Sequence, residues 1–288
     1  MYPFGKEDGP VKLVSTEWLE SNMENVMKLD TQPNVHDYIT EHLEGAVFMQ
    51  EGFLRTSDKG MPAAYSPASA VQTMFRKVGL EPDVPVVIYS GKGPFRGWGD
   101  GLEQTMVAYS LARFGHNKVY VLDGGIDKWK EEGRKVTKEF PEINDSDFTV
   151  SERKNEYAIS MEEVKKAKEE DGVILLDARP AKVYEGQGPW RKPGHIPGAV
   201  NLPWKSLMEE GNPKKLRDLE EVKKILLEHN VTEDKMVICS CGTGREATNE
   251  FVLLNFYLGY PRVRIYEGSF TEWTAYPENP TVTGPNPR

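Results

Sequence analysis

Two cysteines, the only ones in the chain, stand one residue apart in the segment Cys239-Ser240-Cys241-Gly242-Thr243-Gly244. The two glycines let the backbone turn so that successive N–H groups converge. An apolar run precedes the segment and a run with helical spacing starts at Ala247, which predicts a strand-to-helix junction at Cys241. Amide dipoles at such a junction and the guanidinium of Arg245 favour an anion. We therefore expect Cys241 to have a lowered pKa and to react as the thiolate.

The second cysteine has a different expected role. Cys239 ends the apolar run and is predicted to fill the core, as free cysteines commonly do. The alternative for Cys241 is that it too is an inert buried thiol. A disulfide between the two cysteines is strained at this spacing. Zinc needs four ligands and the chain has no second cysteine pair, so we expect neither a metal nor a cofactor.

Three reactions of a thiolate compete at this loop. A tyrosine-phosphatase-like loop needs an arginine six positions after the cysteine, and that position is Ala247. A cysteine hydrolase needs a histidine base, and none of the five histidines is near in the sequence, although the fold could bring one close. Sulfur transfer needs only a thiolate and a ring of amides that can hold a persulfide anion. The loop after Cys241 offers both.

The elements that position this loop belong to a unit that the chain repeats at a spacing of about 150 residues. Val26–Asp30 matches Val173–Asp177, and Val86–Ser90 matches Met236–Ser240. In each copy, short apolar runs typical of buried parallel strands alternate with segments of helical spacing. The predicted elements of the second copy are strands at Val173–Leu176, Met236–Cys239 and Val263–Tyr266, and helices at Met161–Glu170 and Leu219–His229. The fold class is therefore α/β, with two tandem domains, each a central, mostly parallel sheet flanked by helices.

The repeat also divides the chain. We expect a first domain at 11–133, a polar linker at 134–157 and a second, catalytic domain at 158–283, followed by a proline-rich end that extends over the surface. An offset of about 150 residues places Gly91 opposite Cys241, so the first domain lacks the nucleophile.

Composition excludes several classes of protein. The 288 residues carry a net charge of −9 and no block of basic residues, which disfavours nucleic-acid binding. No apolar run approaches the roughly 20 residues of a membrane span. The first residues lack the pattern of a signal peptide, so we expect a cytoplasmic protein with no membrane partner.

Four motifs in a fixed order resemble those of tandem-domain rhodaneses, which are thiosulfate or 3-mercaptopyruvate sulfurtransferases. They are Leu176-Asp177-Ala178-Arg179, Gly194-His195-Ile196-Pro197-Gly198-Ala199, Cys241-Gly242-Thr243-Gly244 and Tyr266-Glu267-Gly268-Ser269-Phe270-Thr271-Glu272-Trp273. The resemblance covers roughly residues 11–283 and implies two rhodanese-like domains. It implies that Cys241 takes up sulfane sulfur as a persulfide and passes it to cyanide or a thiol. The residues expected to hold the persulfide are Gly242, Thr243, Gly244, Arg245, Glu246 and Ala247.

The resemblance leaves the sulfur donor open. Mercaptopyruvate enzymes usually carry Val-Thr where this chain has Arg245-Glu246, and Arg245 would meet a sulfonate. Where relatives often have a substrate-binding arginine, this chain has Val183, with Lys182 beside it. We expect thiosulfate as the donor, 3-mercaptopyruvate as the alternative, and Arg179 and Lys182 as candidate anion contacts. Arg179 is equally suited to pair with a carboxylate.

Two hypotheses of another kind stand beside the enzyme: a non-catalytic rhodanese-fold module that only binds a partner, and a persulfide carrier whose acceptor is a thiol of another protein. Residues of the loop after Gly91, namely Lys92, Arg96 and Trp98, would either reach into the cleft or form a solvated loop. Structural roles are expected for Asp177, His195, Trp129 and Trp273.

Overall fold

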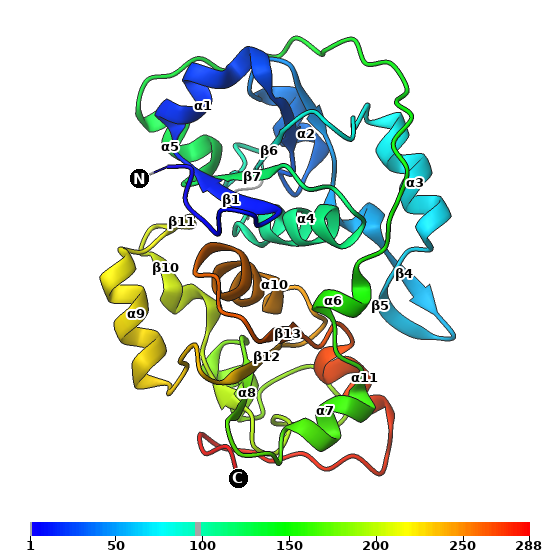
Figure 1. The fold of residues 1–288 in the computed structure, drawn as a ribbon, viewed down its shortest axis with the longest axis vertical. Helices are drawn as coiled ribbons and strands as arrows, with labels where there is room; N and C mark the ends of the chain where they lie inside the picture. The colour runs from blue at the N-terminus through cyan, green and yellow to red at the C-terminus, as the bar shows by residue number, and fades with distance from the viewer. Residues whose placement is uncertain (1, 96–98) are drawn as a thin grey trace.

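The computed structural model describes residues 2–95 and 99–288, which form two α/β halves stacked end to end (Figure 1). Each half is built on an all-parallel sheet. The first sheet has the strand order β1 (Val11–Val14), β7 (Val119–Leu122), β6 (Val86–Tyr89), β2 (Met27–Asp30) and β3 (Ala46–Phe48). The second has the order β13 (Val263–Ile265), β12 (Met236–Ser240), β8 (Val173–Asp177) and β9 (Val200–Asn201). The last four strands of the first order therefore correspond one by one to the four strands of the second, as the sequence repeat predicts.

Helices flank both sheets. The first half contains α1 (Thr16–Asn22), α2 (Val35–Thr40), α3 (Ala68–Lys77), α4 (Leu102–Arg113) and α5 (Gly125–Glu131), with short 3₁₀ turns at Met23–Asn25 and Glu51–Leu54. The second contains α6 (Lys154–Tyr157), α7 (Met161–Ala167), α8 (Ala181–Glu185), a 3₁₀ turn at Trp204–Leu207, α9 (Leu219–Glu228), α10 (Ala247–Phe251), which continues as a π-helix at Val252–Tyr257, and α11 (Ser269–Ala275).

The predicted strands and helices of the second half are confirmed, with small shifts at their ends. The predicted capping box is present at α7, where Ser160 and Glu163 each bond the other's backbone N–H. This helix ends at Ala167, three residues earlier than predicted, because the N–H groups of Glu169 and Glu170 bond carbonyls only three residues back. The tighter turns replace the last α-helical turn.

Helix α4 joins the two halves. All of its residues are buried, because it packs on its own sheet and on α10 of the other half (Figure 1). A helix covered on every side needs apolar or paired residues all round. Its charged residues Glu103 and Arg113 are accordingly paired with residues of the second half.

Each half also sends a hairpin to the other. The hairpin β4–β5 (Arg55–Asp58 and Met61–Tyr65) packs on α11, and the hairpin β10–β11 (Met208–Glu209 and Asn212–Leu216) packs on α5. The second hairpin is fixed by backbone bonds, since Gly124 N–H donates to the Lys214 carbonyl at 3.1 Å. Each half therefore contributes one hairpin that packs on a helix of the other half.

The segment 134–153 is extended, with neither helix nor strand among its residues. It lies on the first half, where Thr137 pairs with His42. The boundaries 11–133, 134–157 and 158–283 remain a proposal. No helix in the described part of the chain combines the length and the apolar character that crossing a membrane requires.

Candidate active site

The structure places Cys241 directly after the central strand β12, between the carboxyl ends of β8 and β13. The Cys241 Sγ atom accepts the N–H of Gly244 at 3.1 Å and lies 3.9 Å from the hydroxyl of Ser269. The N–H of Cys241 donates to the same hydroxyl at 3.1 Å. The predicted strand-to-helix junction is confirmed, and a loop amide faces the sulfur as expected.

The N-terminus of α11 holds this loop in shape. The carbonyl of Cys241 accepts the N–H of Phe270 at 3.0 Å, and the carbonyl of Gly242 accepts the N–H and hydroxyl of Thr271 at 2.9 and 2.8 Å. The first N–H groups of a helix have no partner within the helix, so they are free to bind the loop. With its carbonyls turned toward α11, the loop can direct an N–H group at the sulfur.

Ser269 is a site residue whose role sequence reasoning missed. It is fully buried, and its φ of 50° lies in the left-handed region that residues other than glycine rarely adopt. Strained backbone of this kind concentrates at functional sites. The signal was available, because Ser269 lies in one of the four motifs and its counterpart in the repeat is Gly125.

Burial changes the chemistry expected of Cys241. The side chain is completely inaccessible to water, and burial, followed by the negative charge of Glu246, raises the pKa of the Cys241 thiol well above its ordinary value. The N–H groups of Ala247 and Thr243 act in the opposite direction with less effect. The prediction of a lowered pKa is therefore wrong for this closed arrangement, because the sequence could not show that the loop would be covered.

The other cysteine is part of the core, as predicted. Cys239 is fully buried on β12, and burial raises the pKa of its thiol. Trp129, Trp273, Asp177 and His195 are also buried. Each has a structural partner: Asp177, for example, accepts the N–H of Arg179, and the ring of His195 stacks on Tyr184.

Arg245 does not face the sulfur. Its guanidinium forms ion pairs with three carboxylates of the first half, Glu51 at 2.6 Å and Asp100 and Glu103 at 3.1 Å. The expectation that Arg245 meets a sulfonate is thus not met, since its donors are taken up across the interface. Together with Arg55, which donates to the carbonyl of Thr243, it ties the loop to the first half.

The Arg245 cluster predicts a pH dependence of stability. Burial and the charges of Asp100 and Glu51 raise the pKa of Glu103 to about 7, against an ordinary 4.5, although Arg245 opposes the shift. The folded protein then keeps a proton that the unfolded chain releases, so the Glu103 contribution to the free energy of unfolding falls as pH rises from 4.5 toward 7. In Glu103→Gln we expect a flatter dependence of the unfolding free energy on pH than in the wild type, measured by urea titration.

The same substitution at Glu162, which is exposed on α7, serves as the control. It should leave the pH dependence unchanged. Equal slopes in Glu103→Gln and the wild type would contradict the assignment of a raised pKa to Glu103.

The two candidate anion contacts have different surroundings, and Arg179 lies beside the loop, since a Cβ atom on Gly242 would lie 3.7 Å from its Cδ atom. Arg179 is fully buried, pairs with Asp177 through two nitrogen atoms and packs on Trp190 and Phe270. Arg179 thus has the carboxylate partner that suits a structural role, while its Nη1 atom is buried without a hydrogen-bond partner among residues 2–95 and 99–288, and its role as an anion contact stays a prediction. Lys182 is exposed on α8.

In the first half, Gly91 occupies the position that corresponds to Cys241. A Cβ atom there would lie 2.4 Å from a methyl group of Ile126, so this loop has no room for a cysteine side chain. Lys92 donates its N–H to Asp127 at 2.9 Å. Arg96 and Trp98, named above as candidates to reach the cleft, lie outside the described residues.

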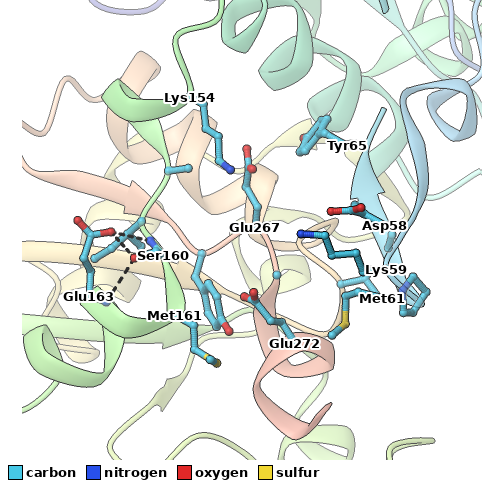
Figure 2. Close-up of a pocket in the computed structure, with 18 of the residues that line it drawn as sticks. Asp58, Lys59, Met61, Tyr65, Lys154, Ser160, Met161, Glu163, Glu267 and Glu272 are labelled. Carbon is cyan, nitrogen blue, oxygen red and sulfur yellow. Dashed lines mark hydrogen bonds between the residues drawn. The ribbon is translucent and has the colours of Figure 1, made fainter. Parts of the chain in front are cut away.

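A cavity of about 590 Å³ lies between the halves (Figure 2). It reaches Thr243 in the loop after Cys241, which is called the persulfide loop below. Its walls come from the hairpin β4–β5, the segment 154–163 and the turn between β13 and α11. Among the labelled side chains are Lys59, Lys154, Glu267 and Glu272. No group of three histidine, cysteine or acidic side chains in the described residues is arranged to hold a metal ion.

Comparison with known proteins identifies the family. The profile of the rhodanese-like domain matches residues 15–132 and 160–276, one copy in each half. The chain belongs to the rhodanese family. Among rhodanese relatives, a putative thiosulfate sulfurtransferase of Synechococcus elongatus is 34% identical over 96% of this chain and 86% of its own length.

Two further relatives carry related names. The sulfur carrier protein TtuD of Thermus thermophilus is 29% identical over 92% of this chain and 94% of its own length. The structure of SseA from Escherichia coli, described as a 3-mercaptopyruvate sulfotransferase with the rhodanese fold, is 26% identical. It matches 90% of this chain and 98% of its own with a TM-score of 0.78. Two tandem rhodanese-like domains and membership of a sulfurtransferase family are thereby confirmed.

Proposed function

We propose that the protein is a sulfurtransferase that moves sulfane sulfur from thiosulfate to cyanide or a thiol through a persulfide on Cys241. The observation that carries the proposal is the Cys241 Sγ atom at the end of β12, with the N–H of Gly244 directed at it from 3.1 Å. An N–H group in this position stabilises the negative charge of a thiolate or persulfide.

The reaction divides into two displacements. The Cys241 thiol first loses its proton to a base in solution, and the N–H of Gly244 stabilises the thiolate that forms. The Cys241 thiolate then attacks the outer sulfur of thiosulfate, and the S–S bond breaks so that sulfite leaves with the electron pair. The acceptor finally attacks the outer sulfur of the persulfide and returns the Cys241 thiolate.

Thiosulfate is proposed as donor because the putative thiosulfate sulfurtransferase of Synechococcus elongatus is 34% identical, whereas the 3-mercaptopyruvate sulfurtransferase of Escherichia coli is 29% identical. The decisive measurement compares kcat/KM for thiosulfate and 3-mercaptopyruvate with cyanide as acceptor. We expect the larger value for thiosulfate, and the mass of the intact protein should rise by one sulfur atom and fall again on adding cyanide. A larger kcat/KM for 3-mercaptopyruvate would show that 3-mercaptopyruvate is the donor. If no sulfur adduct formed, the hypothesis of a non-catalytic module that only binds a partner would remain.

A persulfide carrier is the second candidate, favoured by the similarity to TtuD. It predicts slow turnover with small acceptors and rapid transfer to a specific protein thiol. Faster turnover with cyanide and simple thiols than with protein thiols would exclude it. The cytoplasmic location stays a prediction from the sequence.

A further inference from the structure

The cavity beside Thr243 has an equivalent place in the first half, and there the side chain of Lys214 is buried. The internal repeat pairs the hairpin β4–β5 with the hairpin β10–β11, and the sequences Met61-Pro62-Ala63-Ala64-Tyr65 and Asn212-Pro213-Lys214-Lys215-Leu216 align on their prolines. Both second strands pack on the helix that follows the last strand of the opposite sheet, α11 or α5. Ala63 therefore aligns with Lys214 of the other hairpin, although the φ of 63° at Ala63 lies in the left-handed region and that of Lys214 does not.

Lys214 is packed tightly at the counterpart. Its side chain is only 3% exposed, and its ammonium pairs with Asp127 at 3.0 Å. Its carbon chain packs so closely on the opposite half that a Cβ atom on Gly101 or Gly125 would lie 2.7 or 3.1 Å from it. In the first half, an alkyl chain that ends in an ammonium group is thus buried between the halves.

This ammonium lies beside the first-half equivalent of the persulfide loop. Its partner Asp127 accepts the N–H of Lys92, and Lys92 corresponds to Gly242. In the catalytic half the equivalent of Asp127 is Thr271, which also bonds the loop backbone but in the opposite direction, because its hydroxyl donates to the carbonyl of Gly242 at 2.8 Å. Both members of the Lys214–Asp127 pair are therefore replaced in the catalytic half, and the space they would fill is open where it meets the loop.

The charge on the floor of the open cavity is reversed. In the first half the side chain of Lys128 is the nearest neighbour of a Cβ atom added to Gly124. In the catalytic half the equivalent glycine is Gly268, and its nearest neighbour is the side chain of Glu272. Glu272 and Glu267 line the cavity on this side, and both are partly buried. Glu267 is already paired with Arg113. In the described residues Glu272 has no ion pair, and its charge and hydrogen bond help burial to raise the pKa of the Tyr266 hydroxyl beside it. The exposed side chains of Lys59 and Lys154 also line the cavity, with their ammonium groups on the side of the two glutamates (Figure 2).

We propose that this cavity binds the sulfur acceptor and that the acceptor is an aminothiol, whose ammonium group takes the place that Lys214 fills in the other half and pairs with Glu272. The inference rests on the proposed function and adds the chemical class of one substrate. The thiolate of the acceptor attacks the outer sulfur of the Cys241 persulfide and the S–S bond breaks. The electron pair returns to Cys241 Sγ, and the product is the persulfide of the aminothiol.

The first test compares acceptors that differ in the ammonium group. Cysteamine carries it, 2-mercaptoethanol has a hydroxyl in its place, and cyanide reports turnover without a thiol. At equal thiolate concentration we expect kcat/KM for cysteamine to exceed that for 2-mercaptoethanol by about tenfold or more, the size of effect that one charge-assisted hydrogen bond gives. Equal values for the two thiols would overturn the proposal.

The second test places the lysine of the counterpart into the cavity. Ala63→Lys should supply its own ammonium and lower the ratio of kcat/KM for cysteamine to kcat/KM for 2-mercaptoethanol to about one. Ala63→Met is the matched control of similar length without charge, and Glu272→Gln removes the proposed partner. In Ala63→Met we expect kcat/KM for cysteamine still to exceed that for 2-mercaptoethanol, although the longer side chain leaves less room for either thiol. In Glu272→Gln we expect the two values to be equal. A preference that survives in Glu272→Gln would contradict the assigned partner.

A binding measurement separates this inference from the proposed function. Calorimetric titration of the resting protein with n-propylamine needs no sulfur transfer, and we expect binding by the wild type that Ala63→Lys and Glu272→Gln abolish. Binding without persulfide formation from thiosulfate would retain the ammonium site and reject the proposed function. Persulfide formation with no binding of n-propylamine would reject the ammonium site alone.

Discussion

Cys241→Ser is expected to abolish sulfur transfer from every donor, with a loss in kcat of about 10⁴-fold or more. The hydroxyl is nearly the same size as the thiol, so the bonds from the loop to α11 remain while the atom that carries the sulfur is lost. Mass spectrometry of the intact protein after incubation with thiosulfate gives the most direct readout. The wild type should gain one sulfur atom and the variant none.

The control for this prediction is Cys239→Ala. Cys239 is buried on β12 and its removal leaves a small cavity in the core, so we expect a modest loss of stability and most of the transfer activity. If both variants lost activity to the same degree, a mechanism that uses two thiols would replace the one proposed.

Gly244→Ala is expected to have the second largest effect, because this position must be glycine for two reasons. Its φ of 83° is in the left-handed region, and a Cβ atom would lie 2.5 Å from the carbonyl oxygen of Glu267. Because the obstacle is backbone, the loop itself must shift, and the N–H bond to Cys241 Sγ is lost with it. We expect kcat to fall by about 100-fold, the range measured for removing one donor to a developing anion.

Gly172→Ala separates the two reasons. Gly172 has a φ of 77° with no atom within 4 Å of an added Cβ, so alanine there meets the backbone strain without the collision. It should cost about 1 kcal/mol of stability and leave kcat unchanged. Similar stability losses in the two variants with no difference in kcat would show that the loop tolerates a shift at Gly244.

Local pattern predicted the parts of the fold that depend on neighbours in the sequence. The apolar runs located β8, β12 and β13, and the serine and glutamate before α7 located its capping box. The repeat spacing located Gly91 opposite Cys241, and the collision with Ile126 explains why no side chain stands there. These features follow from segments of a few residues and from their order.

The features that pattern could not predict depend on contacts between the halves. The sequence predicts that Arg245 is a cation of the loop that faces an anion. Its partners in the structure are Glu51, Asp100 and Glu103 of the first half, more than 140 residues earlier in the chain. The pKa of Cys241 likewise depends on burial, and burial comes from packing rather than from the loop sequence. Arg179 illustrates the same limit, because only the fold shows that its pairing with Asp177 is buried.

The hairpins that pack on the opposite half make part of each surface dependent on the other half. In the first half, Gly124 donates its N–H to the carbonyl of Lys214, and Asp123, which already accepts from Tyr2, also accepts the N–H of Leu216. A chain cut before residue 212 lacks both partners on β11, so the N–H of Gly124 loses its backbone acceptor. The first half in isolation therefore has a different hydrogen-bonding surface at this place from the one it has in the full chain.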